Sequence, residues 1–172
     1  YFEISHETLV RKIWTWLEPE EIRFKYWRRT LIQIVGDHRQ WQLLPTQLQW
    51  RELNAQREVS VLGAEDAAVM CDICLLLGDE EDCDYWLARA EKTGFDVWSA
   101  ISETIANGAL DARIRATHWA GTKNDVNRVV ALRAALCGPY EAVRRQAIRA
   151  TEALAPDESA RVREGYTVPA AF

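Results

Sequence analysis

The sequence lacks the features that mark membrane, secreted and disulfide-rich proteins. No run of 18 apolar residues occurs, because Asp72 interrupts the longest candidate near 69–77, and we therefore expect no membrane-spanning helix. No basic-then-apolar leader opens the chain, so we expect no signal peptide and a cytoplasmic location. Four cysteines in 172 residues are too few for a disulfide scaffold, and reduced thiols are the expectation.

Signatures of catalysis are scarce as well. The chain has three histidines, and no Ser/His/Asp or Cys/His spacing in it is typical of a catalytic family. The phosphate-loop motif G-x-x-x-x-G-K-[ST] is missing, so the chain by itself is not expected to hydrolyse ATP. We predict that it is not an enzyme and that it holds no cofactor of its own.

Charge is distributed unevenly along the chain. Residues 1–60 carry nine basic and eight acidic side chains, residues 61–106 carry two and eleven, and residues 107–172 carry ten and seven. An acidic middle segment repels nucleic acid, and the small basic excess that follows it is weak for a nucleic-acid footprint. We therefore expect protein partners, with neither a membrane nor a nucleic acid among them.

What the sequence does contain is a regular series of glycines. Five of them, from Gly78 to Gly138, are separated by 13 to 17 residues. A glycine just past a helix end relieves the strain of a left-handed residue, so the series predicts short helices that each end at a glycine. The segments between them are rich in good helix formers. The predicted helices span 64–77, 80–93, 95–107, 109–120, 123–137 and 140–155. Within this series, Thr122 and Asp125 have the spacing of a capping box, and Pro139 stands at a helix-start position.

The first sixty residues have a different pattern, rich in tryptophan and arginine. Ser5 is predicted to cap a first helix, and Pro19 to begin a second helix that ends at Gly36. A third helical stretch is expected from 37 to about 60, interrupted at Pro45. We therefore divide the chain into residues 1–60 and residues 61–172.

A faint internal repeat is present in the second of these parts. Residues 112–116 align with residues 143–147 at an offset of 31, and the identical pairs are Arg113/Arg144 and Ala116/Ala147. The pattern V-R-x-x-A followed by small residues resembles HEAT repeats. Such helix pairs cannot bury their apolar faces alone, so the resemblance implies an all-α fold in which pairs stack into an α-solenoid. Three pairs are expected, over 64–93, 95–120 and 123–155.

A second resemblance covers roughly residues 1–60. The run Phe2 to Arg11, followed by Trp14, Trp16-Leu17, Glu20-Glu21 and Arg28-Arg29-Thr30-Leu31, resembles the end of the winged-helix module of STAND NTPases, the signalling ATPases related to apoptosome and plant-immunity receptors. The resemblance implies a winged-helix remnant followed by a helical connector. It also implies that His6, beside Glu7, contacts the phosphates of bound ATP or ADP. Because the phosphate loop is missing and the first residue is Tyr1, the nucleotide would belong to an NTPase domain upstream.

Cysteine spacing offers a weak candidate for a metal site. Cys71 and Cys74 form a C-x-x-C that Cys83 and His118 would complete as a zinc site, and the same pair is a candidate redox couple. The motif lies inside an apolar predicted helix, where buried cysteines are common. We therefore expect neither a metal nor redox chemistry there.

Contacts with partner proteins are assigned to two tryptophans and three arginines: Trp86, Trp98, Arg144, Arg145 and Arg149. The preferred interpretation is a non-catalytic sensor or scaffold segment of a STAND-type signalling ATPase. Three alternatives stay open: a free-standing HEAT-like binding protein, a HEAT-type enzyme subunit of the bilin-lyase or DNA-alkylation-glycosylase kind, and a small immunity or anti-defence protein. Oligomerisation of the full-length protein stays open as well.

Overall fold

The computed structural model describes residues 19–59 and 63–164, which form helices and connecting turns with no strand in either range. The all-α class is therefore confirmed for these residues. The chain divides into two compact units, Tyr1–Val61 and Leu62–Phe172. None of the helices in the described ranges combines the length and the apolar character needed to cross a bilayer. His6 and the first part of the winged-helix resemblance, from Phe2 to Leu17, lie outside the described residues, whereas its later residues, Glu20-Glu21 and Arg28 to Leu31, lie in α2.

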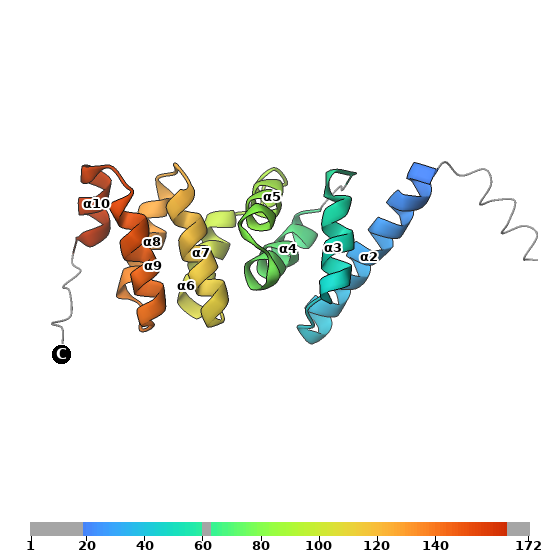
Figure 1. Ribbon diagram of the computed structural model, residues 1–172, viewed down its shortest axis with the longest axis horizontal. Helices are drawn as coiled ribbons and strands as arrows, with labels where there is room; N and C mark the ends of the chain where they lie inside the picture. Colours follow the sequence, from blue (N-terminus) through green and yellow to red (C-terminus); the bar gives the residue numbers. More distant parts are fainter. Residues whose placement is uncertain (1–18, 60–62, 165–172) are drawn as a thin grey trace, which may run out of the picture. The chain divides into compact units, whose positions relative to one another are not determined.

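The described part of the first unit consists of α2 (Pro19–Trp41), α3 (Gln47–Ala55) and the 3-10 turn η1 (Arg57–Val59) (Figure 1). The prediction that Gly36 ends a helix is wrong, because α2 continues through it for five more residues. A glycine inside a helix costs about 1 kcal/mol relative to alanine. Packing of α2 against α3 outweighs this cost: Trp27 is buried and its Nε1 donates to the carbonyl oxygen of Leu53 at 2.8 Å.

A capping box begins α3 directly after Pro45. The hydroxyl of Thr46 accepts from the backbone N–H of Gln49 at 3.3 Å, and the side-chain oxygen of Gln49 accepts from the backbone N–H of Thr46 at 2.9 Å. These two bonds satisfy donors that every helix start leaves without partners. The predicted interruption at Pro45 therefore falls between α2 and α3.

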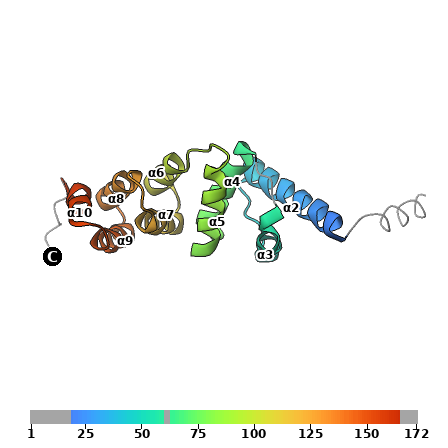
Figure 2. The same cartoon turned by 90° about the horizontal axis from the view of Figure 1, so that it is seen from above.

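The second unit contains seven helices within residues 63–164, which pack in sequential pairs followed by one further helix. Helix α6 packs on α8, α8 packs on α10, and α7 packs on α9. Figure 2 shows α6 and α8 on one side and α7 and α9 on the other. These helices therefore form two layers. The bounds are α4 (Ala64–Leu77), α5 (Glu80–Glu91), α6 (Val97–Asn107), α7 (Leu110–Thr122), α8 (Asn127–Cys137), α9 (Glu141–Glu152) and α10 (Pro156–Arg163).

The pair α4–α5 departs from this regular stacking. Helix α7 packs against both helices of the preceding pair, α4 and α5. Helix α9, by contrast, packs against α7 of its preceding pair and against its own partner, α8. In Figure 2, α5 runs across a view in which α6 to α9 are seen nearly end-on. The first pair is therefore turned relative to the two that follow it, and this brings the first turn of α5 beside the middle of α7.

The series of glycines plays more than one structural role. Of the glycines in the described residues, only Gly94 has a positive φ, of 81°, so the left-handed explanation holds there alone. At Gly78 and Gly108 the backbone is extended, and a Cβ would lie 2.6 Å from the carbonyl oxygen of Cys74 and of Thr104, respectively. Glycine is needed at these two ends because the preceding turn approaches too closely for any side chain.

Gly121 does not end a helix, contrary to the prediction. It lies inside α7, where a Cβ would come within 2.5 Å of the Cβ of Ala150 on α9. A glycine opposite an alanine lets the two helices approach closely. The prediction therefore mistook a position of helix–helix contact for the end of a helix.

Two predicted helix starts are also wrong. The hydroxyl of Thr122 donates backwards to the carbonyl oxygen of Trp119 at 2.8 Å, so Thr122 closes α7 and caps nothing after it. Asp125 accepts from the backbone N–H of Asn127 at 2.7 Å, and α8 begins there. Pro139 precedes the start of α9 by two residues. Helix α10, which buries only Val162 in its short span, is absent from the predicted set.

The arginines of the internal repeat make equivalent contacts. The Nε of Arg113 donates to the carbonyl oxygen of Gly108 at 2.6 Å, and a terminal nitrogen of Arg144 donates to that of Gly138 at 2.9 Å. In both cases the guanidinium binds the end of the preceding helix, where carbonyls lack partners and the helix dipole is negative. The paired residues Ala116 and Ala147 are both fully buried. The two repeat segments therefore occupy equivalent environments.

Candidate functional site

The first turn of α5 and the middle parts of α7 and α9 enclose a hollow of about 250 Å³ in the second unit. Its apolar walls include Cys83, Ile114 and Trp119. Its polar lining comes from all three helices and from the turn before α5, and consists of Asp79, Glu80, Arg115, His118 and Gln146. The hollow exists because α5 is turned toward α7.

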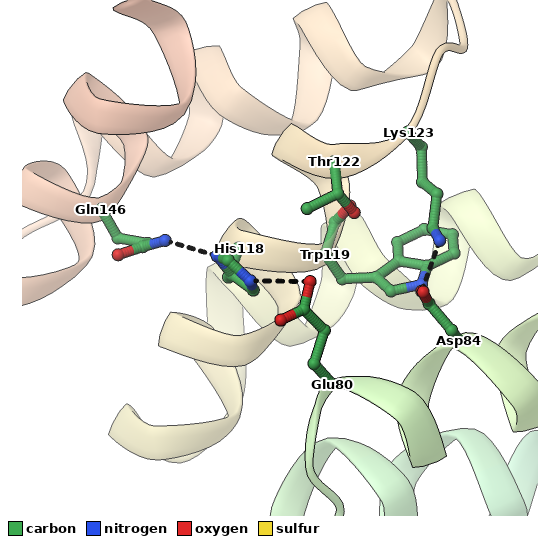
Figure 3. A network of polar contacts seen from close by, with 7 residues as sticks. All are labelled: Glu80, Asp84, His118, Trp119, Thr122, Lys123 and Gln146. Atoms are coloured by element: carbon green, nitrogen blue, oxygen red, sulfur yellow. Dashed lines mark hydrogen bonds and ion pairs between the residues drawn. The ribbon is translucent and has the colours of Figure 1, made fainter. Parts of the chain in front are cut away.

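His118 connects the three helices at this hollow (Figure 3). Its Nδ1 lies 2.8 Å from the amide nitrogen of Gln146, and its Nε2 lies 3.4 Å from a carboxylate oxygen of Glu80. The Gln146 amide nitrogen is a donor, so Nδ1 is its acceptor, while Nε2 faces the carboxylate of Glu80. The ring on α7 therefore contacts α9 through Gln146 and α5 through Glu80.

A second polar contact joins α5 to the end of α7. Lys123 pairs with Asp84, and its Nζ also lies 5.1 Å from the ring centroid of Trp119 (Figure 3). The ring of Trp98 on α6 lies 5.2 Å from that of Trp119, centroid to centroid. Trp119 is only 8% exposed, and in the part of the chain that the structure describes its Nε1–H has no hydrogen-bond partner. A buried donor without a partner is uncommon in proteins.

Arg115 and Asp79 are engaged with the ends of helices. A terminal nitrogen of Arg115 donates to the carbonyl oxygens of Leu75 and Leu76, at 3.0 and 2.7 Å, at the end of α4. One oxygen of Asp79 accepts from the backbone N–H of Asp82 at 2.9 Å and so caps α5. Arg115 therefore lies at the negative end of the α4 dipole, and Asp79 at the positive end of the α5 dipole.

The thiols of the C-x-x-C motif and of Cys83 are buried. The Sγ of Cys74 donates to the carbonyl oxygen of Cys71 at 3.1 Å, and the Sγ of Cys83 donates to that of Cys74 at 3.2 Å. Burial, together with the nearby charge of Asp72, raises the pKa of Cys71 from 9.0 to about 12. Burial and the neighbouring Cys83 thiol raise the pKa of Cys74 as well. These groups stay protonated and packed at neutral pH.

The four candidate zinc ligands are not brought together. Within residues 19–59 and 63–164, no group of three or more His, Cys, Asp or Glu side chains is arranged to hold a metal ion. Cys83 and His118 line the hollow, whereas Cys71 and Cys74 are fully buried on α4. The spacing of the motif reflects a buried helix face.

The predicted interaction residues have different environments. Trp86 is fully buried and packs edge-on against Tyr85, so its ring belongs to the core. Trp98 is half-buried against Trp119. Arg144 binds the end of α8, and Arg145 pairs with Glu141 on the surface. The remaining residue of the set, Arg149, is exposed on α9.

Glu80, Arg115 and Gln146 were not among the predicted site residues. The internal repeat contains a signal for two of them, because Arg115 and Gln146 occupy equivalent positions at the offset of 31. Both line the hollow, one from α7 and the other from α9. For Glu80 the sequence shows only an acidic cluster at a helix start, which a helix dipole explains equally well.

Comparison of the chain with protein families, with curated proteins and with solved structures finds no match.

Proposed function

We propose that this chain is a non-catalytic interaction module in which HEAT-like helix pairs stack as an α-solenoid and bind a protein partner. The observation that supports it most directly is the equivalence of Arg113 and Arg144, each bound to the C-terminal end of the preceding helix. The packing of α6 on α8 and of α7 on α9 agrees with it. In a stack of this kind, helices of one layer line up into an extended binding surface.

The binding surface is the face formed by α5, α7 and α9. This face carries the hollow, and two of its polar groups are open to solvent: the side chains of Glu80 and His118 are 63% and 44% exposed. Sites for small molecules usually measure about 300–1,000 Å³. A hollow of about 250 Å³ suits one side chain of a protein partner better than a cofactor.

The resemblance to STAND NTPases gives this module a wider setting. In that setting it is a cytoplasmic sensor or scaffold segment, and an upstream domain binds ATP or ADP with help from His6. The test is to read the gene upstream of the codon for Tyr1. An in-frame G-x-x-x-x-G-K-[ST] motif is expected, and a start codon directly before Tyr1 would contradict this setting while leaving the interaction module untouched.

The interaction module itself is tested by selecting binders from a random peptide display library on the 172-residue chain. We expect the selected peptides to slow amide hydrogen exchange around Glu80, His118 and Gln146. We also expect Gln146→Ala to weaken their binding, because this change removes the amide from the face. The matched control is Asn107→Ala, which removes an exposed amide from α6 in the other layer. Peptides that protect only α6 and α8, or a library that yields no binder, would contradict the proposal.

A further inference from the structure

We propose that the hollow between α5, α7 and α9 binds an arginine side chain of a basic peptide. This inference builds on the proposed function, since it names the partner chemistry of the same face. Three properties of the hollow support it: its hydrogen-bonding capacity, its charge and its apolar walls.

Acceptors predominate among the hydrogen-bonding groups that remain available. The Nε2 of His118 faces Glu80, and the donors of Arg115 that face α4 are used by two carbonyl oxygens. The second carboxylate oxygen of Glu80, the second oxygen of Asp79 and the amide oxygen of Gln146 have no partner within the described residues. Guanidinium carries five N–H donors in a planar fork, which matches such a set of oxygens.

The charge around the hollow favours a cation. The carboxylates of Asp79 and Glu80 line it. The positive charge of Arg115 is directed to the end of α4, and Lys123 is paired with Asp84. An excess of carboxylates therefore remains on this side of the hollow, and it attracts a basic side chain over a neutral or acidic one.

The apolar walls suit the long stem that carries a guanidinium. Ile114, Trp119 and Cys83 provide the carbon and sulfur surface against which a three-carbon stem packs. Trp119 also has a buried N–H with no hydrogen-bond partner within the described residues.

The test uses the full chain and a five-residue probe, one arginine flanked by glycines and blocked at both ends. Two companion probes carry lysine or the uncharged isostere citrulline in its place. Binding is followed by NMR through the indole N–H signal of Trp119, assigned with a Trp119→Phe variant. We expect a saturable shift with the arginine probe, weaker binding of lysine and no shift with citrulline. Glu80→Gln should weaken binding of the arginine probe at least fivefold. Glu103→Gln, a matched change on α6, should leave its binding unaltered.

Two outcomes would overturn the arginine assignment: citrulline or lysine binding as tightly as arginine, or Glu80→Gln binding like the parent. The citrulline comparison measures binding to the parent chain alone, so it stands even if Glu80→Gln disturbs folding. Display-selected peptides that protect α5, α7 and α9 but contain no basic residue would overturn this assignment and leave the interaction module intact. If no peptide of any composition protects that face, the module fails as well.

Discussion

At the scale of single residues, burial separates the four cysteines into two groups. Cys71, Cys74 and Cys83 are buried, and only Cys137 is exposed. A thiol reacts as the thiolate, so low accessibility and a raised pKa both suppress its reactivity. We expect a thiol-specific reagent at pH 8 to label one cysteine quickly and the other three only when the chain is unfolded. Cys137→Ser should abolish the fast phase, and a fast phase that survives this change would contradict the burial of the other thiols.

The raised pKa of Cys71 also predicts how stability depends on pH. In the unfolded chain this thiol ionises near 9.0, whereas in the folded chain it ionises near 12. The stabilisation is therefore complete below pH 9 and is lost as pH rises toward 12, since the unfolded state loses its proton first. The loss approaches about 1.4 kcal/mol per pH unit inside this window. Urea unfolding at pH 8, 9 and 10 should show that the free energy of unfolding falls more steeply with pH for the parent than for Cys71→Ala. Equal slopes for the two chains would refute this prediction.

At the scale of helices, two glycines in helix interiors provide a matched pair. Gly36 lies in α2 with nothing within 4 Å of the position of a Cβ, whereas at Gly121 that Cβ would lie 2.5 Å from the Cβ of Ala150. Gly36→Ala should stabilise the chain by about 0.5–1 kcal/mol, because alanine is the better helix former. Gly121→Ala should instead destabilise it by about 1–3 kcal/mol, because overpacking exceeds that gain. Urea unfolding followed by circular dichroism measures both changes.

A double variant separates close packing from other causes. If α7 and α9 meet at Gly121 and Ala150, the added methyl of Gly121→Ala is accommodated when Ala150 becomes glycine. We expect Gly121→Ala with Ala150→Gly to recover part of the lost stability, so that the two changes are coupled. Simple addition of the two single effects would show that α7 and α9 do not touch there.

The arginines of the repeat give a prediction about the ends of helices. Arg113→Met and Arg144→Met keep an apolar stem but remove the bonds to the carbonyl oxygens of Gly108 and Gly138. The free energy of unfolding of each variant should fall by about 1–2 kcal/mol, because hydrogen bonds from charged donors are strong and the carbonyl oxygen is left without its partner. Arg149→Met is the control, because Arg149 is exposed and has no bond or ion pair within the described residues. It should stay within about 0.5 kcal/mol of the parent. Equal losses in all three variants would contradict a specific role for the repeat arginines.

Helices were more predictable from this sequence than their ends or contacts. The bounds of α4 agree with the prediction over Ala64–Leu77, because glycines flank the segment on both sides and its interior is strongly apolar. The end expected at Gly36 and the start expected at Thr122 are wrong, because tertiary packing and a backward hydrogen bond override local propensity there. Helix α10 is short and polar, so its periodicity is too weak to predict it.

At the scale of the whole molecule, the candidate site arises from stacking. His118 and Gln146 are 28 positions apart and reside on different helices, and Glu80 comes from a third. Their meeting depends on the orientation of α5 against α7, which neither helical periodicity nor capping signals specify. The repeat offset does place Arg115 and Gln146 at equivalent positions, which is as far as the sequence alone leads toward this site.

The second unit has the contents of an independently folding domain. Its described residues supply a buried core of their own, with Ile73, Trp86, Leu87 and Leu132 inaccessible to solvent. Polar contacts also connect its helices over long separations, such as Arg115 with Leu76 and Arg128 with Glu158. We expect a fragment of residues 62–172 to unfold in urea as a single cooperative transition. The same fragment shortened to residues 62–137 should lose cooperativity, because removing α9 exposes the faces of α7 and α8 that pack against it. A gradual, non-cooperative transition for residues 62–172 would contradict its independence. A shortened fragment as stable as the longer one would show that α9 and α10 contribute nothing to the stack.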